Sequence, residues 1–300
     1  MTFITIIFVL TTFSTSLINC IRAIYNGDET EIQQVPFTVF IKIKPFPESV
    51  VKICGGVILD AKTVLTAAHC VNSSEGIQIV AGSANPLTDK NVQRRVPAEI
   101  ILHPKYDYDS YRNTTLFDFA LVKLGTPLSF NRKVQAAKLP RHEDVPIGIM
   151  AQVCGWGSKN EEPVVSPTLL CTSAHILNNS YCDVLQKKIH LRPEMICTAR
   201  SSCQGDSGSG LIHHGTVLGI VSFTLGPCNY AAPPVVHGKV SEILDFIKNN
   251  TALINQELMP EYETRCSELG LQQLRRKVAS MMTAYDILLG RLNNDYLKTI

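Results

Sequence analysis

The sequence predicts an all-β domain, a barrel or a sandwich, followed by a separate helical segment. From about residue 24 to residue 240, apolar residues occur in short runs separated by Gly, Pro, Asn and Asp, as in proteins with many short antiparallel strands. Beyond Asn250, apolar residues instead recur every three or four positions, which indicates a helix. The chain also contains 10 cysteines, a number that favours a disulfide framework formed in an oxidising compartment.

The first segment is an apolar run, residues 2–18, that is typical of a secretory signal peptide. No Lys or Arg precedes the run, and its apolar core is short for a membrane span. We assign residues 1–20 to a signal peptide and expect a secreted, extracellular protein; a retained membrane anchor is the alternative. Acceptor sequences for N-glycosylation agree with export, and they begin at Asn72, Asn113, Asn178 and Asn249.

The next segments are predicted strands and two helices. Residues 37–44 alternate as in a strand with one buried face, and further runs lie at 57–59, 77–80, 99–102, 119–124 and 217–221. A helix is expected over 241–248, where Ser241 can cap it and Ile243, Phe246 and Ile247 share a face. A long amphipathic helix is expected over 264–298, and we expect it to pack on the rest of the protein or to self-associate.

The residues 201–210, SSCQGDSGSG, contain a candidate nucleophile, Ser207. A serine hydroxyl reacts only when a base takes its proton, another group orients that base, and N–H groups receive the oxyanion. The amides of Gly205 and Ser207 can supply two such N–H groups on one tight turn, because glycine permits the backbone geometry that this turn requires. The base must then come from elsewhere in the chain.

His69 and Asp118 are the candidates for the base and for the acid that orients it. His69 follows a strand-like run and precedes Cys70, which can anchor it. Asp118 is the single acid at the start of the apolar run 116–124, where an unpaired carboxylate would be costly to bury. The other histidines, such as His103 and His213, lack a comparable context.

Three sequence blocks resemble the chymotrypsin-like (trypsin-family) serine proteases in content and order: TAAHC around His69, DFALVKL around Asp118 and CQGDSGSG around Ser207. CGGVIL at 54–59, CGWG at 154–157, MICTA at 195–199 and GIVSF at 219–223 are further matches. The resemblance covers residues 24–250 and implies two six-stranded antiparallel β-barrels with a C-terminal helix. Residues 251–300 are then an appended C-terminal helical extension.

The resemblance also implies the role of each site residue. Ser207 attacks the peptide carbonyl, His69 acts as general base and then general acid, and Asp118 holds the imidazole. The amides of Gly205 and Ser207 form the oxyanion hole. The family implies no cofactor and no catalytic metal, and its partners are protein or peptide substrates and protease inhibitors. A protease-fold protein that no longer cleaves and acts by binding is the rival interpretation, although no triad residue is lost.

The family pattern also implies the disulfide pairing. It pairs Cys54 with Cys70, Cys182 with Cys197, and Cys203 with Cys228. Cys154 and Cys171 lack their usual partners, and because the family places them on neighbouring strands, we predict a bridge between them. The pairing of Cys20 and Cys266 stays open.

Activation in this family depends on a new N-terminal ammonium that pairs with the acid before the nucleophile. Here the resemblance implies a pair between Ile24 and Asp206, after removal of a short propeptide, residues 21–23. A trypsin-like cut after Arg22 would leave one extra residue, Ala23. Whether the cut falls after Arg22 or after Ala23 stays open.

The pocket that selects the residue before the scissile bond is implied by four positions: Ser201 at its base, Ser222 and Thr224 on the strand that binds substrate backbone, and Val235 on its wall. Ser201 carries no charge, so cleavage after Lys or Arg is not expected. Two β-branched walls, Thr224 and Val235, favour small to medium apolar side chains, as in elastases. An open, chymotrypsin-like pocket for aromatic residues is the alternative. The net charge of +2 argues against a nucleic-acid partner.

Overall fold

The computed structural model describes residues 27–44, 52–72, 74–109, 114–141, 145–158, 165–185, 191–199, 201–224 and 234–251. By its internal contacts the chain divides into two units, Met1–Ile247 and Lys248–Ile300. The predicted signal peptide and propeptide lie outside the described residues, and so does the predicted helix 264–298.

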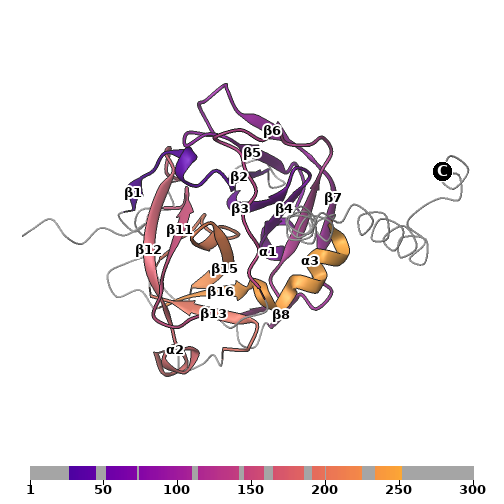
Figure 1. Ribbon diagram of the computed structural model, residues 1–300. Helices are drawn as coiled ribbons and strands as arrows, with labels where there is room; N and C mark the ends of the chain where they lie inside the picture. Colours follow the sequence, from indigo (N-terminus) through magenta and orange to yellow (C-terminus); the bar gives the residue numbers. More distant parts are fainter. Residues whose placement is uncertain are drawn as a thin grey trace, which may run out of the picture. The chain divides into compact units, whose positions relative to one another are not determined.

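The N-terminal half of the first unit forms a sheet whose two edge strands are neighbours in the chain (Figure 1, purple strands). Its strand order is β6-β5-β2-β3-β4-β10-β7. The edge strands β6 and β7 are separated only by Val96, so the sheet must curl until its two edges approach each other. The strands are β2 (Thr38–Ile43), β3 (Lys52–Asp60), β4 (Thr63–Thr66), β5 (Gln78–Ala81), β6 (Gln93–Arg95), β7 (Pro97–Leu102) and β10 (Ala120–Leu124).

The C-terminal half forms a second sheet that closes on itself (Figure 1, pink to orange). Its order is β1-β12-β11-β14-β15-β16-β13, and an additional pairing between β12 and β13 closes six of these strands into a barrel. Strand β1 is added at the side of β12. The strands are β1 (Asp28–Glu29), β11 (Met150–Gly155), β12 (Leu170–Leu177), β13 (Met195–Thr198), β14 (Gly210–His213), β15 (Thr216–Thr224) and β16 (Val235–Lys239).

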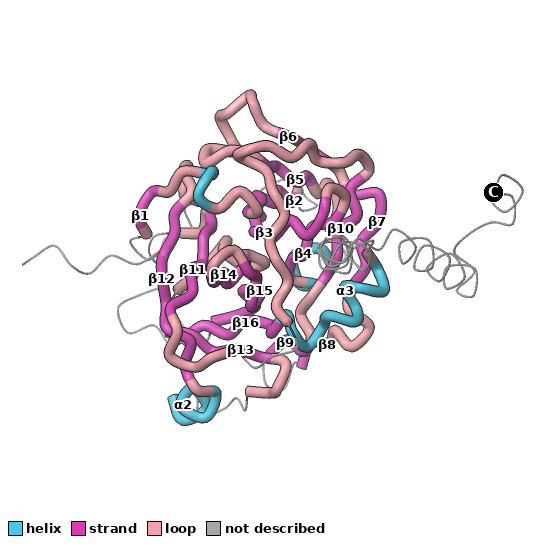
Figure 2. Tube along the Cα trace, viewed as in Figure 1, coloured by secondary structure: helices cyan, strands magenta, loops and turns pink. Residues whose placement is uncertain are grey.

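The predicted class, an all-β fold built from two barrels, is therefore confirmed. The barrels differ in closure: antiparallel pairing closes the second, whereas the paired strands of the first form a half-barrel over the described residues. Figure 2 shows how few helices accompany the strands. The remaining elements are the hairpin β8 (Asp107–Asp109) and β9 (Thr114–Leu116), α1 (Ala68–Val71), α2 (Asn179–Leu185), α3 (Leu244–Asn250), and the 3-10 helices η1 (Ile32–Gln34) and η2 (Val240–Ile243).

Strand β2 is buried on both faces, whereas its alternation predicted one buried face. Val39, Ile41 and Ile43 are almost fully buried, but so is Phe40 on the opposite face. The ring of Phe40 meets Trp156 of the second barrel edge to face, with centroids 5.4 Å apart. The second barrel thus covers the face that the sequence pattern assigned to solvent.

The C-terminal helix begins differently from the prediction. The turn opens as a 3-10 helix at Val240, and Lys239 stands at its N-cap without a side-chain cap. Ser241 therefore lies inside the turn and does not cap it. The predicted apolar face is present, because Ile243 and Ile247 are buried and Phe246 contacts the ring of His103 at 4.8 Å.

The structure confirms three predicted disulfides: Cys54–Cys70, Cys154–Cys171 and Cys182–Cys197. Cys154 and Cys171 lie directly opposite each other on the antiparallel strands β11 and β12, with their Cα atoms 4.1 Å apart. Cys203 is also disulfide-bonded. Its predicted partner Cys228 lies outside the described residues, as do Cys20 and Cys266.

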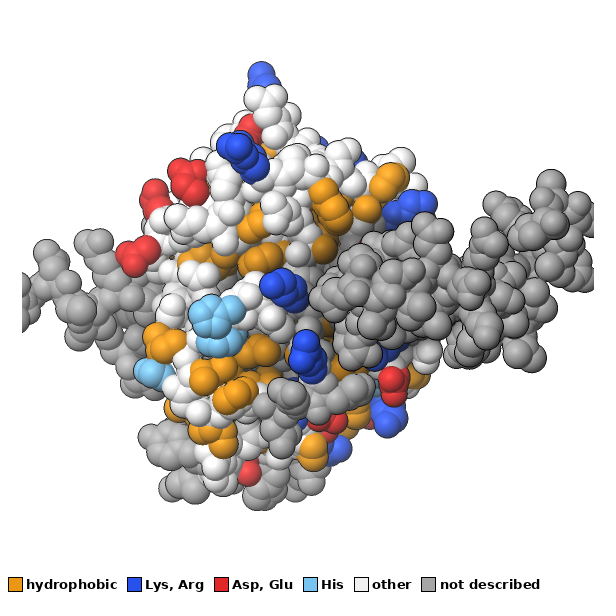
Figure 3. All heavy atoms as spheres, viewed as in Figure 1, with side chains coloured by type: hydrophobic (Ala, Val, Ile, Leu, Met, Phe, Trp, Pro, Cys, Tyr) orange, Lys and Arg blue, Asp and Glu red, His pale blue; other side chains and the backbone are white. Residues whose placement is uncertain are grey.

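On the side shown in Figure 3, the surface carries both basic and acidic side chains, and neither sign of charge covers the whole face. Within the described part of the chain, no helix is long and apolar enough to cross a membrane. Of the predicted glycosylation acceptors, Asn72, Asn178 and Asn249 are exposed, and Asn113 lies outside the described residues.

Candidate active site

His69 lies on α1, a single turn that directly follows strand β4. Ala67 precedes the turn in extended conformation. Cys70, which follows His69, is bonded to Cys54 on β3. The hydroxyl of Thr66, the last residue of β4, donates to the carbonyl oxygen of Gly55 at 2.8 Å. The TAAHC block thus fixes the histidine to strand β3 by a covalent bond and a hydrogen bond.

Asp118 holds His69 through both carboxylate oxygens. His69 Nδ1 lies 2.7 Å from Asp118 Oδ2, and the His69 backbone N–H donates to Oδ1 at 2.9 Å. The Asp118 side chain is 1% exposed, whereas the imidazole is 26% exposed. When Nδ1 carries the proton that Asp118 accepts, Nε2 is the basic nitrogen, and the sulfur of Cys70 lies 3.8 Å from it.

Two hydroxyl groups complete the surroundings of Asp118. Ser222 donates to Oδ2 at 2.5 Å, and Thr115 lies 3.4 Å from the same oxygen and 2.8 Å from Ser222. Burial alone would raise the pKa of Asp118, but the His69 and Ser222 hydrogen bonds and the His69 charge together hold that pKa below its usual range. The acid therefore stays ionised beside the imidazole.

Ser207 lies on a tight turn between two glycines in left-handed conformation. The φ angles of Gly205 and Gly208 are 96° and 82°. The carbonyl oxygen of Ser207 accepts a hydrogen bond from the N–H of Gly55 at 2.8 Å, which ties the turn to strand β3. A Cβ atom on Gly208 would lie 2.3 Å from Thr66 Oγ1 and 3.3 Å from Ala67 N, so the turn packs against the residues that lead into α1.

The turn also leaves two backbone N–H groups available. Over the described residues, the amides of Gly205 and Ser207 have no hydrogen-bond acceptor. Both residues are half-buried, and two such N–H groups on one turn fit a site that receives an anionic oxygen.

Asp206 is buried directly under this turn. Its oxygens accept hydrogen bonds from the N–H groups of Gly157 and Cys203, both at 2.9 Å. Burial raises the pKa of Asp206 to about 6, and the two N–H donors pull that pKa down. A Cβ atom on Gly157 would lie 2.5 Å from an Asp206 oxygen, which explains why the CGWG block contains a glycine there. The predicted partner of Asp206, Ile24, lies outside the described residues.

Three strands bring the predicted pocket residues together. Thr224 on β15 lies opposite Val235 on β16, and Val235 lies opposite Thr198 on β13, so the three residues form a row across the barrel wall. The Ser201 hydroxyl lies 3.0 Å from that of Thr198. Ser201 is 1% exposed and Val235 is fully buried, whereas Thr224 is half-buried. Ser222 is predicted on the strand that binds substrate backbone, and its side chain donates to Asp118.

The sequence reasoning missed several residues around the site. Thr115 contacts the Asp118 carboxylate, Lys52 donates to the carbonyl oxygen of His69 at 3.2 Å, and Thr198 and His237 form a buried cluster with Ser201. No local motif marks these residues, because their partners are distant in sequence. The one available sequence signal was that His237 follows two valines, Val235 and Val236, in a predicted pocket segment.

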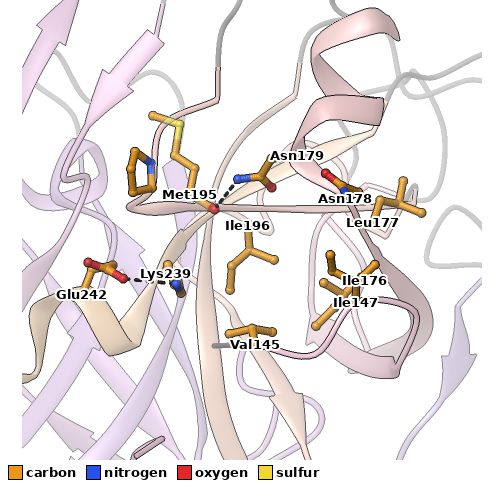
Figure 4. Close-up of a pocket in the computed structure, with 11 residues that line it drawn as sticks. Val145, Ile147, Ile176, Leu177, Asn178, Asn179, Met195, Ile196, Lys239 and Glu242 are labelled. Carbon is orange, nitrogen blue, oxygen red and sulfur yellow. Dashed lines mark hydrogen bonds and ion pairs between the residues drawn. The ribbon is translucent and has the colours of Figure 1, made fainter. Parts of the chain in front are cut away.

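The C-terminal barrel also carries a surface pocket of about 470 Å³ (Figure 4). Its lining includes Val145, Ile147 and Met195, with Lys239 and Glu242 forming an ion pair at 3.1 Å on one side. It contains none of the predicted catalytic residues. Among the described residues, one group could hold a metal by its atom types, namely Cys54, His69 and Cys70, but its two cysteines are joined in a disulfide.

Comparison with known proteins agrees with this geometry. The trypsin family model matches residues 24–247. Trypsin 5G1 of Aedes aegypti is 31% identical over 77% of this chain and 85% of its own length. The trypsin of Simulium vittatum is 34% identical over 72% and 87%, and a chymotrypsin of Phaedon cochleariae is 29% identical over 76% and 82%. The chain belongs to the trypsin family, and it is a chymotrypsin-like serine protease, a hydrolase.

Proposed function

We propose that this protein is a secreted endopeptidase that cleaves peptide bonds with Ser207, His69 and Asp118. The single observation that carries the proposal is the contact between His69 Nδ1 and the buried Asp118 at 2.7 Å, which directs the basic Nε2 away from the acid. The turn of Ser207 packs against the residues that lead into α1, and this supports approach of the hydroxyl to that nitrogen.

The proposed reaction proceeds through an acyl-enzyme. Nε2 of His69 takes the Ser207 proton as the hydroxyl oxygen attacks the substrate carbonyl, and Asp118 stabilises the imidazolium that forms. The amides of Gly205 and Ser207 bind the oxyanion. His69 then gives the proton to the leaving amine, and a water molecule, activated in the same way, releases the acid product.

An activity-based probe tests the assignment. We expect a fluorophosphonate to label the protein once its N-terminus is Ile24, and we expect Ser207→Ala to abolish labelling and to lower kcat by about 10⁶-fold. Asp118→Asn should lower kcat by about 10⁴-fold, because the wrong imidazole tautomer is then favoured. Full proteolysis by Ser207→Ala would refute the proposal. A folded wild-type protein that neither reacts with the probe nor cleaves peptides would support a binding role instead.

We propose that the pocket prefers small to medium apolar side chains before the scissile bond. The row Thr224, Val235 and Thr198 supports this, because two β-branched side chains lie side by side on the proposed wall. Ser201 offers no charge, so a Lys or Arg side chain would lose its hydration without gaining an ionic partner, at a cost of several kcal/mol.

Digestion of a peptide library measures this preference. We expect cleavage after Ala, Val and Leu in a graded order, because each methylene changes discrimination by about 1–3 kcal/mol. The double variant Thr224→Gly and Val235→Gly should raise cleavage after Phe and Tyr relative to Ala. Thr216→Gly, at the opposite end of β15, is the matched control. Dominant cleavage after Lys or Arg by the wild-type enzyme would refute the pocket assignment, and dominant cleavage after Phe or Tyr would support the open pocket.

The remaining assignments follow from secretion. We propose a signal peptide over residues 1–20, activation by exposure of the Ile24 amine to Asp206, and glycosylation at Asn72, Asn113, Asn178 and Asn249. The exposed positions of Asn72, Asn178 and Asn249 support glycan attachment. Partners are protein or peptide substrates and protease inhibitors. Residues 251–300 are proposed to pack on the protein or to self-associate.

A further inference from the structure

A buried chain of three polar side chains lies at the base of the proposed pocket. The hydroxyl of Thr198 lies 2.9 Å from His237 Nε2 on one side and 3.0 Å from the Ser201 hydroxyl on the other. Thr198 and His237 are fully buried, and Ser201 is 1% exposed. These three polar groups are buried, and among the described residues their side chains are partnered only by one another. Each hydrogen in this hydrogen-bonded chain can point toward His237 or toward Ser201. The direction decides whether Ser201 presents a hydrogen-bond donor or an acceptor to the pocket.

The strand register places this chain beside the substrate strand. Ile196 lies opposite His237, and Thr198 lies opposite Val235, so His237 and Thr198 project from the same face of the barrel wall. Val221 of β15 lies opposite His237 on its other side, one residue before Ser222. The polar chain is thus continuous with the row of Thr224 and Val235 that forms the proposed pocket wall.

The second ring nitrogen of His237 fixes the direction of the hydrogens. Nδ1 is buried and has no hydrogen-bond partner among the described residues. A buried N–H group without an acceptor is rarer and more costly than a buried lone pair without a donor. The neutral ring therefore carries its proton on Nε2 and donates it to Thr198. Because Thr198 then accepts from His237, its own hydrogen is directed to Ser201.

The ring is neutral for a simple reason. Complete burial lowers the pKa of His237 to about 3, and no acidic side chain among the described residues contacts the ring. A neutral ring has one proton to place, so the direction of the chain follows from the single choice between Nε2 and Nδ1.

The Ser201 hydroxyl hydrogen is left over at the end of the chain. Ser201 accepts from Thr198, and the described residues offer no acceptor for its own hydrogen. Ser202, the next residue, is 6% exposed, and its hydroxyl also has no partner among the described residues. The Ser201 hydroxyl therefore has one hydrogen bond, which it accepts from Thr198, and its own hydrogen stays without a partner among the described residues. A hydrogen bond made there is screened from water, which strengthens it and makes an unpaired group costly.

We propose that His237 is a specificity-determining positioning residue, which acts through Thr198 to turn the Ser201 hydroxyl hydrogen toward the substrate side chain. The pocket floor is then a neutral hydrogen-bond donor. Among side chains small enough for the slot, it favours those that carry a neutral acceptor oxygen. Apolar side chains of the same size fit but leave the hydroxyl unpaired. A donor floor opposes Lys and Arg, and a neutral ring supplies no charge to pair with Asp or Glu. This inference rests on the proposed endopeptidase function and refines its specificity.

A pair of substrates that differ in one atom tests the proposal. In O-methylserine an ether oxygen replaces one methylene of norvaline, so the two side chains have the same length and only one can accept a hydrogen bond. Peptide amides with these residues before the scissile bond should show kcat/KM about 3- to 10-fold higher for O-methylserine, which is the size of one neutral hydrogen bond. A ratio of one or below would overturn the proposal, because a reversed chain would present a lone pair to the ether oxygen.

Variants of Thr198 separate positioning from a purely structural role. Thr198→Val keeps the shape but removes the group that donates to Ser201, so the Ser201 hydroxyl is no longer held in one orientation and the substrate ratio should fall. Thr198→Ser keeps the hydroxyl and should retain the wild-type ratio. Both variants are compared by their thermal unfolding first. An unchanged ratio in a folded Thr198→Val enzyme would refute the relay.

The ring proton can be located without turnover. In Ser207→Ala protein labelled with ¹⁵N histidine, nuclear magnetic resonance distinguishes a protonated from an unprotonated ring nitrogen, and His237→Gln identifies the signals. We expect the proton on Nε2; a proton on Nδ1 would overturn the inference. The failure of the two proposals is distinguishable, because absence of cleavage of both substrates refutes the endopeptidase, whereas the resonance experiment reports the relay in either case.

Discussion

Two buried aspartates near the active site have pKa values shifted in opposite directions, because their hydrogen-bond partners differ. Asp118 accepts from the His69 ring, the His69 amide and Ser222, and its pKa is held below the usual range. Among the described residues, Asp206 accepts from two backbone N–H groups and from no side chain, and burial raises its pKa to about 6. An acid with a raised pKa is incompletely compensated for burial. A cation beside Asp206 would compensate for the cost of burying its charge, and the proposed Ile24 ammonium supplies one.

This difference predicts how pH acts on the unprocessed protein. The folded pKa of Asp206, about 6, exceeds its unfolded value of 3.8, so the neutral acid stabilises the fold fully below pH 3.8. That stability is lost as pH rises through 6, and a difference of about two pKa units corresponds to about 3 kcal/mol. We expect the unfolding free energy of a chain that retains residues 21–23 to fall in this window. A chain that begins at Ile24 should not lose it, because the ammonium pairs with the carboxylate.

Denaturant unfolding at pH 4, 5, 6 and 7 measures the effect, with Ser207→Ala in both chains to prevent autolysis. The other side chains of the folded domain are common to both chains, so the difference between the two chains isolates Asp206. Asp206→Asn removes the ionisable group and should make the two pH profiles parallel. Parallel profiles in the chains that retain Asp206 would contradict the proposed activation pair.

At the scale of elements, the turn from Gly205 to Gly208 joins the two barrels. Ser207 accepts from Gly55 on β3 of the first barrel, and Gly208 donates to Val221 on β15 of the second at 2.8 Å. Gly208 has a positive φ and also packs against Thr66 and the Gly55 carbonyl. The conformation and the close approach both require glycine, so the spacing of GDSGSG is a packing requirement as well as a chemical one.

Gly208→Ala should therefore lower the unfolding free energy by more than the strain of a positive φ angle alone would. Gly215, in the hairpin between β14 and β15, has a similar φ of 77°, but a Cβ atom there meets nothing within 4 Å. We expect Gly215→Ala to lower the unfolding free energy by about 1–2 kcal/mol and to leave kcat unchanged. Gly208→Ala should cost about 1–3 kcal/mol more and lower kcat about 10²-fold, because the nucleophile is displaced. Chemical unfolding and steady-state kinetics on both variants measure the two effects. Equal losses would show that the close approach is unimportant.

Strand pairing explains which disulfide inferences could succeed without coordinates. The bridge between Cys154 and Cys171 was predictable once the family pattern placed both residues on neighbouring strands, since directly opposed residues in an antiparallel pair come within bonding reach.

The double burial of β2 was not predictable. Alternation within a strand reports one covered face, but it contains no information on whether a second domain covers the other.

At the scale of the whole molecule, the features that could be predicted from the sequence are those carried by short contiguous blocks of residues. The blocks around His69, Asp118 and Ser207 carry their own packing requirements, and the structure confirms the contact between His69 and Asp118. The chain of Ser201, Thr198 and His237 was not predictable, because its members come from three segments and each looks ordinary locally. Such contacts arise only when the barrel closes β13 against β16. Long-range register, and not local pattern, therefore limits what the sequence reveals about the pocket.

The end of the folded protease unit can be located by two truncations. Helix α3 ends at Asn250, and the described triad and pocket residues all precede it. A chain cut after Thr251 should fold and retain kcat/KM within about 2-fold, because the proposed triad and pocket residues all precede the cut. A chain cut after Lys239 removes the buried residues Val240, Ile243, Leu244 and Ile247. Burial of each such side chain contributes about 1.5–3 kcal/mol, so their sum is comparable to the whole stability of a domain, and this chain should not fold. Circular dichroism and active-site titration of both chains measure folding and activity. Loss of turnover in a folded chain cut after Thr251 would show that the extension takes part in catalysis.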